Sequence, residues 1–301
     1  MNGVIVINKE SRFTSFDVVA IVRRTLNTKK VGHCGTLDPN ATGVLPVLVG
    51  NATKAQDIIP NHDKAYVASF ELGLSSDTLD IWGEVQKHKK PQLTRAQLEK
   101  ALSNFVGEIM QTPPMYSAVQ KDGVRLYELA RKGIEIEREA RQITIYSLSL
   151  DSFDEKTQSG TLSVSCSKGT YIRQLIADIA NSFGTTAVMT ALVRTSACGF
   201  TLENAISLDT LKELKEKNEV ENHLMSIESL FVDYSELLVS DKQSHRFKNG
   251  NPLDINRTAL RDSAVENGTI FRVKSEQGEF LALGVVDLAK GVIKIYKHFG
   301  I

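Results

Sequence analysis

One loop-forming stretch reads Val31-Gly32-His33-Cys34-Gly35-Thr36-Leu37-Asp38-Pro39-Asn40-Ala41-Thr42-Gly43. It presents a single carboxylate, Asp38, followed by a proline that fixes its own φ near about −65° and disfavours helical geometry at the residue before it. Its glycines permit backbone angles and close approaches that a side chain would forbid. The apolar run 44–49 predicts a strand that anchors the loop, and Pro46 indicates an edge or a bulge in that strand.

A carboxylate on such a loop can be a nucleophile, a general base or a metal ligand, or it can belong to an ordinary Asp-Pro turn. A metal site is the least favoured of these, because one Asp lacks the further ligands that a metal needs. The loop alone does not decide between the remaining alternatives.

Composition describes an ordinary globular protein with an uneven charge distribution. The chain has 301 residues, of which 42% are hydrophobic and 24% charged, which allows one large domain or a large and a small one. Lys plus Arg and Asp plus Glu both number 36. Residues 201–240, however, hold three positive and nine negative side chains, a net charge of −6. The rest of the chain is therefore net basic, which permits a local basic groove.

The sequence also indicates where the protein works. Cys34, Cys166 and Cys198 are widely separated, form no zinc pattern and fit a reducing cytosol. The N-terminal apolar run is too short for a signal peptide, and no stretch approaches the ~18 apolar residues of a membrane span. We expect a cytoplasmic monomer with no membrane partner.

Local patterns up to residue 200 alternate between strands and helices. We expect strands at 3–7, 64–73, 142–150, 160–165 and 192–195. The strands at 142–150 and 160–165 should pair with each other. A helix capped by Thr14 or Ser15 should end near Asn27, with Phe16, Val19, Ala20 and Val22 on its apolar side. A second helix should begin at Thr94, where Gln97 completes a capping box. The polar stretch 75–83 is interpreted as a turn rather than a calcium loop.

Two further segments carry charge in informative places. Residues 119–133 interleave basic side chains with aromatic ones, which suits a surface that follows phosphates and stacks bases. A helix with a solvated charged face explains the same pattern equally well. Arg173 falls in the first turn of a predicted helix, where the macrodipole does not favour a cation. This position indicates a specific carboxylate or phosphate partner, or an ordinary surface Arg.

After residue 240 the pattern changes to short strand-like runs at 269–274, 280–286 and 291–296, separated by glycine turns. This spacing is typical of a small β-barrel or sandwich. We therefore expect two domains, residues 1–238 and 239–301.

Taken together, these motifs resemble the bacterial tRNA pseudouridine-55 synthase (TruB) family over most of residues 3–200. The motifs that carry the resemblance, in the family's order, are residues 32–43, Lys64-Ala65-Tyr66, Ser76-Asp77-Thr78 with Asp80 and Gly83, residues 113–118 with Gly123, Tyr127, Ala130 and Arg131, residues 166–173, and Leu192 with Arg194-Thr195. The last sixty residues resemble the family's small RNA-binding domain of PUA type. The chain departs from the family pattern at residues 9–12, Gln120 and Val193.

The resemblance implies an α/β (α+β) catalytic domain around a mixed, largely antiparallel sheet, in which residues 115–142 form a mobile segment that clamps RNA. The implied activity converts uridine to pseudouridine at position 55 in the T loop of tRNA, with the T-arm stem-loop as partner and with no cofactor or metal. The ribose attachment of uracil moves from N1 to C5.

The resemblance also assigns roles to residues. Asp38 would be the nucleophile, by attack on C6 of the uracil, by attack on C1′ of the ribose, or by assisting formation of a glycal. Arg173 would pair with Asp38, and Tyr66 would stack on the target base and accept or relay a proton. The implied substrate-binding residues are His33, which would fill the space left by the extruded uridine, Leu192, which would pack against the base, Lys64, Tyr171 and Lys168.

Two other classes of function remain open at this point. A glycoside hydrolase could use Asp38 with a second carboxylate such as Asp80, and it would release uracil instead of retaining the base on the RNA. An RNA-binding or folding module would have no chemistry, and its activity would survive the loss of Asp38.

Overall fold

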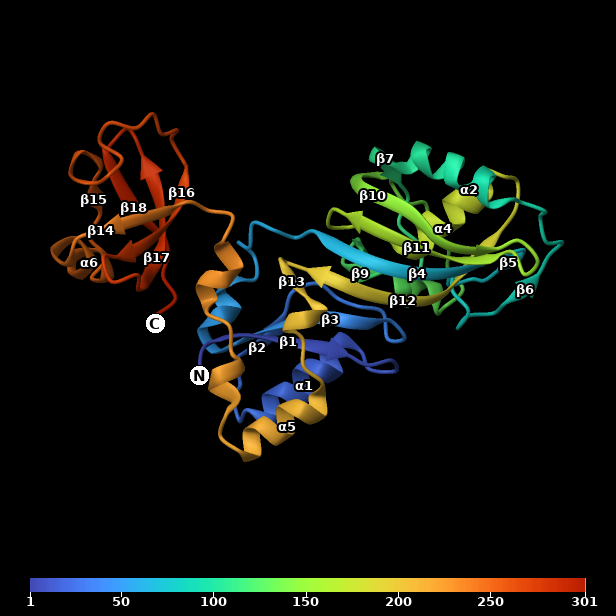
Figure 1. Cartoon of the computed structure of the whole chain (residues 1–301), viewed down its shortest axis with the longest axis horizontal. Helices are drawn as coiled ribbons and strands as arrows, with labels where there is room; N and C mark the ends of the chain where they lie inside the picture. Colours follow the sequence, from blue (N-terminus) through green and yellow to red (C-terminus); the bar gives the residue numbers. More distant parts are fainter. Residues whose placement is uncertain (301) are drawn as a thin grey trace.

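The computed structural model describes residues 1–300, which form two bodies, each built around its own β-sheet (Figure 1). Over these residues the larger sheet has nine strands in the order β1-β3-β12-β4-β11-β10-β7, with β2 paired to β3 and β13 paired to β12. All of its pairs are antiparallel except β3 with β12. The predicted mixed, largely antiparallel sheet is thus confirmed. Its strands are β1 (Gly3–Lys9), β2 (Val31–His33), β3 (Thr42–Val49), β4 (Lys64–Leu72), β7 (Gly107–Gln111), β10 (Arg141–Asp154), β11 (Ser159–Cys166), β12 (Ala187–Ala197) and β13 (Phe200–Thr201).

Helices cover the two halves of this sheet separately (Figure 1). Helices α1 (Ser15–Thr25) and α5 (Leu208–Glu216) pack on β1 and β3, and α2 (Arg95–Leu102) and α4 (Ile172–Asn181) pack on the half that contains β4, β10, β11 and β12. The halves meet where β3 and β12 run parallel, Thr42 and Gly43 opposite Val193 and Arg194. The loop that carries Asp38 enters the sheet at this junction.

Strand β3 corrects the expectation about Pro46. The strand is paired with β1 from Gly43 to Val49, without a shift in register, and its other side is shared by β2 and β12. It is therefore an interior strand with no bulge. Pro46 lacks only an N–H, and its carbonyl still accepts a hydrogen bond from the backbone N–H of Cys34 (2.9 Å). A central strand can hold a proline where no ladder bond requires its N–H.

Helix α1 begins as predicted but turns a different face to the sheet. Thr14 is the N-cap and forms a full capping box with Asp17. The buried side chains are Val18, Val19 and Val22, whereas Phe16 is 66% exposed and Ala20 is also exposed. The buried Ser15 hydroxyl bonds the backbone of Leu37, and this contact fixes the rotation of the first turn. The predicted apolar side was therefore wrong at two of its four positions.

The other capping and strand predictions are confirmed. Thr94 and Gln97 form the capping box of α2, and β4 alternates buried and half-buried residues with Tyr66, Ala68 and Phe70 inside. Strands β10 and β11 are paired, and Arg173 lies in the first turn of α4.

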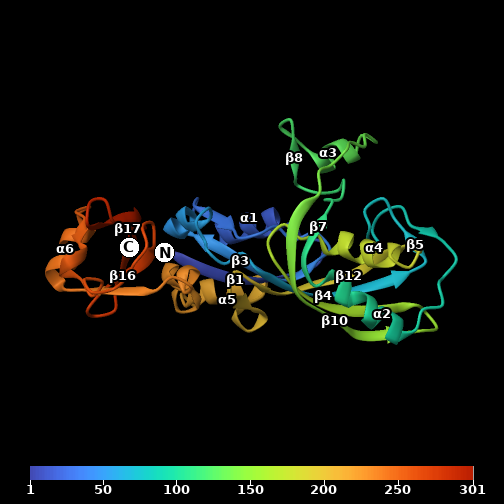
Figure 2. The same cartoon turned by 90° about the horizontal axis from the view of Figure 1, so that it is seen from above.

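Residues 115–142 form a small unit that stands away from the sheet (Figure 2). It contains a hairpin of β8 (Gln120–Lys121) and β9 (Val124–Arg125), the five-residue helix α3 (Leu126–Ala130) and an irregular return to β10. Most of residues 119–140 are exposed, and Leu126 is the only buried residue among 118–140. The remaining short strands, β5 (Leu74–Ser75) and β6 (Gln86–Lys87), pair with each other beside the 75–83 turn.

The C-terminal body holds a five-stranded sheet in the order β14-β16-β17-β18-β15 over the described residues. The three runs predicted from sequence are its central strands, whereas helix α6 had not been predicted. The division expected after residue 238 falls within β14, the first strand of this sheet. Its elements are β14 (Glu236–Val239), α6 (Asp241–Lys248), β15 (Leu253–Asp254), β16 (Ile270–Ser275), β17 (Phe280–Asp287) and β18 (Val292–Lys297).

The two bodies share a hydrophobic core. Phe280, Leu283 and Phe299 of the C-terminal body pack in one cluster with Val4 and Leu48 of the large sheet. The connecting 3₁₀ turn Ile227–Phe231 lies between them, and the Phe231 and Phe299 ring centroids are 5.5 Å apart. The N- and C-termini accordingly lie near each other (Figures 1 and 2). This contact fixes the C-terminal body against the end of the sheet away from α2.

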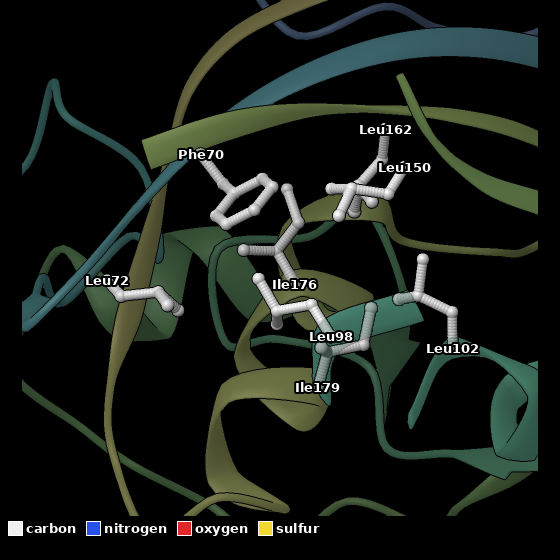
Figure 3. A pocket seen from close by; sticks show the side chains of 8 residues that line it. All are labelled: Phe70, Leu72, Leu98, Leu102, Leu150, Leu162, Ile176 and Ile179. Atoms are coloured by element: carbon white, nitrogen blue, oxygen red, sulfur yellow. The ribbon is translucent and has the colours of Figure 1, made fainter. Parts of the chain in front are cut away.

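The core between the sheet and helices α2 and α4 encloses a small cavity of about 10 Å³ (Figure 3). Only apolar side chains line it: Phe70, Leu72, Leu98, Leu102, Leu150, Leu162, Ile176 and Ile179. With no polar group and room for about one water, it is a packing defect and not a binding site. Among residues 1–300, no helix is both long enough and apolar enough to cross a membrane.

Candidate active site

Two buried anchors hold the loop before and after Asp38. The Ser15 hydroxyl accepts a hydrogen bond from the Leu37 N–H (2.9 Å) and donates to the Leu37 carbonyl (3.3 Å). The Lys9 ammonium donates to the carbonyls of Glu10 (2.9 Å), Phe13 (2.6 Å) and Pro39 (2.9 Å). The residues on both sides of Asp38 are therefore bonded directly to the body, which fixes the backbone that carries its carboxylate.

Arg194 is a third anchor and is completely buried. Its guanidinium donates to the carbonyls of Val44 (2.7 Å), Gly35 (3.0 Å) and Thr36 (3.3 Å). Gly35 and Thr36 precede Asp38 in the loop, and Val44 lies in β3 just after the loop. Gly43 passes so close to this strand that a Cβ would collide with the Arg194 carbonyl, and its φ of +103° also favours glycine. A buried charge of this kind needs a full set of acceptors, and the loop carbonyls supply them.

The carboxylate of Asp38 meets Arg173 at the start of α4. Arg173 Nε lies 2.9 Å from Asp38 Oδ2, and the side chains are 7% and 40% exposed, respectively. The other guanidinium nitrogens donate to the carbonyls of Thr78 (2.7 Å) and Tyr116 (3.0 Å). One Arg thus joins the Asp38 loop to the 75–83 turn and to the proline-rich segment, and these three contacts account for a cation in the first turn of a helix.

The 75–83 turn contributes a second carboxylate at a greater distance. Asp80 Oδ2 lies 3.9 Å from Arg173 Nε, and its Oδ1 accepts from the Thr78 hydroxyl (2.6 Å) and the Trp82 N–H (3.1 Å). Asp80 therefore closes its own turn and only borders the Arg173 guanidinium, whereas Asp38 is the direct partner.

Tyr66 and Leu192 lie in the buried cluster beneath the ion pair. This cluster also contains Leu37 and Ile172, the residues that precede Asp38 and Arg173. Tyr66 is 7% exposed, and burial raises its pKa to about 12, with the nearby charge of Arg194 acting in the opposite direction. The phenol is therefore protonated at neutral pH. The sheet register places Arg194 opposite Tyr66, and Leu192 opposite Ala68.

His33 ends β2 at the beginning of the loop. Its ring lies edge-on to Phe16, with centroids 5.4 Å apart and planes at 80°. Burial and the charge of Arg194 lower its pKa from the usual value, so the imidazole is neutral at pH 7. Its buried Nδ1 has no hydrogen-bond partner among residues 1–300.

The other three predicted binding residues are Lys64, Tyr171 and Lys168. A Cβ on Gly35 would lie 3.2 Å from the Lys64 Cε, so Lys64 borders the loop, and its Nζ donates to the His62 carbonyl (2.6 Å). Tyr171 is the N-cap of α4, where Gln111 bonds both its N–H and its carbonyl. Lys168 is exposed between β11 and α4, and no ion pair or hydrogen bond within residues 1–300 connects its side chain to the loop.

Sequence reasoning missed the supporting residues, namely Lys9, Ser15 and the anchoring role of Arg194. A usable signal existed for two of them, because Lys9 ends the apolar strand β1 and Arg194 lies within the largely apolar strand β12, where a buried cation requires several acceptors. Within residues 1–300, no group of three or more His, Cys, Asp and Glu side chains is arranged to hold a metal ion.

Comparisons with known proteins identify the family of the chain. The family described as "TruB family pseudouridylate synthase (N terminal domain)" matches residues 23–172, and a PUA-like domain matches residues 237–297. The chain is 45% identical to tRNA pseudouridine synthase B of Clostridium perfringens over 95% of this chain and 96% of that one. It is 39% identical to the protein of the same name from Lactobacillus johnsonii, over 93% and 96%.

Solved structures show the same fold at lower identity. A chain of a Cbf5-Nop10-Gar1 complex superposes with a TM-score of 0.75 at 24% identity, covering 99% of this chain and 84% of the other. A chain of an H/ACA RNP bound to a substrate RNA containing 2'-deoxyuridine gives 0.74 at 22% identity, covering 99% and 85%.

The protein is therefore an RNA-modifying isomerase. The chain belongs to the TruB family of pseudouridine synthases and forms pseudouridine in tRNA.

Proposed function

We propose that the enzyme isomerises uridine 55 in the T loop of tRNA and that Asp38 is its nucleophile. The observation that carries this proposal is the ion pair between Asp38 and Arg173, 2.9 Å long, at the centre of the catalytic body. Its geometry suits a reacting carboxylate, because the cation is buried while Asp38 remains 40% exposed. The anchors at Leu37 and Pro39 preorganise the carboxylate before the substrate binds.

The reaction exchanges one bond for another and needs neither an oxidant nor a reductant. The N1–C1′ bond of the nucleotide breaks, the uracil turns within the site, and a C5–C1′ bond forms. The hydrogen on C5 then leaves as a proton, and N1 gains one. Attack of Asp38 on C6, attack on C1′ and formation of a glycal all use this carboxylate and all end with loss of the C5 hydrogen.

The residues around the ion pair provide a place for the base. Tyr66 would stack on the uracil and relay a proton as a neutral phenol, since its pKa is about 12. Leu192, in the same cluster, would pack against the base. A paired or stacked uridine does not reach such a site, so the target must be extruded from the loop, and His33 would occupy the space that it leaves.

The T-arm stem-loop suits the elements outside this site. Within residues 115–142, the guanidinium groups of Arg125 and Arg131 lie 5.9 and 5.3 Å from the Tyr127 ring centroid, which combines cations with an aromatic face. Lys64, Lys168 and Tyr171 would bind the RNA around the target nucleotide. The unpaired bases of an RNA loop can be splayed out and read, unlike those of a duplex.

The remaining assignments follow from this function. Residues 1–238 would act as the catalytic domain, with 115–142 as a mobile clamp, and residues 239–301 would bind RNA, as the match to a PUA-like domain suggests. The protein would act in the cytoplasm as a monomer and without a cofactor.

The bond change supplies the test. A T-arm stem-loop labelled with tritium at C5 of uridine should release tritium to water when mixed with the purified protein and no cofactor. Asp38→Asn keeps the shape of the side chain but removes its negative charge, so this variant should bind the RNA and release no tritium above background. Asp209→Asn, which changes an exposed Asp paired with Lys212 on α5, is the matched control and should behave like the wild type.

Each alternative class gives a different result. Labelled uracil in place of labelled water would indicate a hydrolase. Binding without any release by the wild-type protein would indicate an RNA-binding module. Release by Asp38→Asn near the wild-type rate would remove Asp38 from the mechanism, and failure on the stem-loop with success on whole tRNA would overturn the T-arm as the sufficient substrate.

A further inference from the structure

We propose that Phe16 and His33 form a stacking surface for an unpaired nucleobase next to the target uridine, and that the exposed face of Phe16 is what the base contacts. This inference rests on the proposed position of the target uridine at Asp38. It adds to the site a substrate-binding residue, Phe16, that belongs to none of the motifs described above.

Phe16 is unusually exposed for its type and position. Phe16 is 66% exposed, although it lies in the first turn of α1, in which Val18, Val19 and Val22 are buried. An aromatic ring of this size normally contributes to a core or an interface. Here the ring makes an edge-on contact with His33, with centroids 5.4 Å apart, and most of the residue's surface faces solvent.

The His33 ring beside it adds a second aromatic surface. The imidazole is neutral at pH 7, and its buried Nδ1 has no partner within residues 1–300. The two ring planes meet at 80°, so a base that lies flat on Phe16 would stand nearly perpendicular to the His33 ring. Together the two rings form an L-shaped aromatic corner that a planar base can enter.

The corner is fixed rigidly to the proposed catalytic loop. Ser15, the residue before Phe16, makes two hydrogen bonds with the backbone of Leu37, the residue before Asp38. The capping box of Thr14 and Asp17 orders the same turn from the other side. Phe16 is therefore held at a set position relative to Asp38, as a residue that positions the substrate must be.

The occupant is a nucleobase because the enzyme acts on RNA and the ring offers only a π-face. Phe16 has no polar atom with which to read a base edge, so it would accept any base by stacking. The unit of residues 115–142 rises on the same side as α1 in Figure 2, so RNA held by that unit would lie on the side of the molecule that carries α1. Extrusion of the target uridine leaves its neighbours unstacked, and a platform at this point would replace the lost stacking.

The test combines protein variants with RNA that lacks single bases. Affinities are measured in the Asp38→Asn background, so that turnover does not interfere. Phe16→Ala should weaken binding of the T-arm stem-loop by roughly 5- to 150-fold, the range found when stacking residues are truncated. Phe16→Trp should retain the wild-type affinity. Phe16→Leu keeps apolar bulk without a π-face, and it should lose most of what Phe16→Ala loses.

Stem-loops with one loop base removed at a time then identify the contact. For one loop position next to the target, removing the base should weaken binding to the protein with Phe16 intact as much as Phe16→Ala weakens binding of the intact RNA. With this abasic RNA, Phe16→Ala should cause no further loss of affinity. The melting temperature without RNA should stay the same, because the ring is exposed. Val232→Ala, which truncates another side chain that is 60% exposed, is the control for loss of apolar surface.

Two outcomes would overturn the inference. If Phe16→Ala binds the intact stem-loop like the Phe16 protein, no base rests on the ring. If it weakens every abasic RNA by the same factor as the intact one, Phe16 only supports His33. Neither outcome depends on catalysis, whereas failure of the proposed nucleophile would appear as tritium release by Asp38→Asn with Phe16 unchanged.

Discussion

The loop 31–43 and the segment 115–142 are both placed next to Arg173, but they are built in opposite ways. Every anchor of the loop is a buried polar group, namely Lys9, Ser15 and Arg194, and each bonds loop backbone. The segment has two-residue strands, a five-residue helix and one buried side chain among residues 118–140. Its bond to Arg173 is made at its base, through the Tyr116 carbonyl.

This difference separates two requirements of an enzyme that acts on a large substrate. A reacting carboxylate must already be in place, because small displacements at a reacting centre are costly in rate. A surface that captures RNA gains from exposed charge and tolerates movement, because phosphate contacts act over several ångströms. Changes in the loop should therefore alter the rate or the stability, and changes in the segment should alter affinity.

The largest effect is expected for Arg173→Lys. Lysine keeps the charge but has a single ammonium, which cannot bond Asp38 and the carbonyls of Thr78 and Tyr116 in the same directions. The saturated single-turnover rate should fall by at least about 100-fold, with only a modest loss of RNA affinity. Arg95→Lys, in an exposed pair with Glu99 at 2.6 Å, is the matched control and should leave both unchanged. Loss of affinity with a normal saturated rate would mean that Arg173 serves only to bind RNA.

A pH-dependent change in stability is expected from Lys9. Burial lowers its pKa from 10.5 to about 8. Between these values the unfolded chain holds the proton while the folded chain has lost it, so this group makes the free energy of unfolding rise with pH. The rise should reach about 3 kcal/mol.

Urea unfolding of the wild type and of Lys9→Met from pH 7 to 10.5 checks this sign. The contributions of other groups cancel in the difference between the two proteins. Lys9→Met should be less stable at pH 7, because the Glu10, Phe13 and Pro39 carbonyls lose their donor, and its deficit should grow above pH 8. A deficit that shrinks or stays flat over this range would contradict the prediction.

The smallest effect is expected in the segment 115–142. Replacing the exposed Lys121 and Lys132 by Gln should weaken binding of the T-arm by several-fold. The slope of log affinity against log salt concentration should become shallower by about one to two, because one or two phosphate contacts are lost. The saturated rate should not change. The same substitutions at Lys212 and Lys217, in the acidic region around α5, should change neither property. A fall in rate at saturation would show that the segment takes part in the chemistry.

Part of this architecture follows from short-range patterns in the chain. The capping boxes at Thr14 and Thr94 and the alternation in β4 involve residues a few positions apart, so the sequence predicts them directly. Helix α6 was missed because its only large buried apolar residue is Phe247, which gives no helical period. The motif order was sufficient to identify the family, which supplied Asp38 and Arg173 as a pair.

The tertiary structure alone decided which groups support the site. Arg194 reaches the Gly35 carbonyl across 159 positions, Arg173 reaches the Thr78 carbonyl across 95, and Lys9 reaches the Pro39 carbonyl across 30. The exposure of Phe16 and the interior position of Pro46 depend on the same packing. Backbone carbonyls carry no sequence signature as acceptors, because every residue has one. Only the path of the chain determines which carbonyls surround a buried cation.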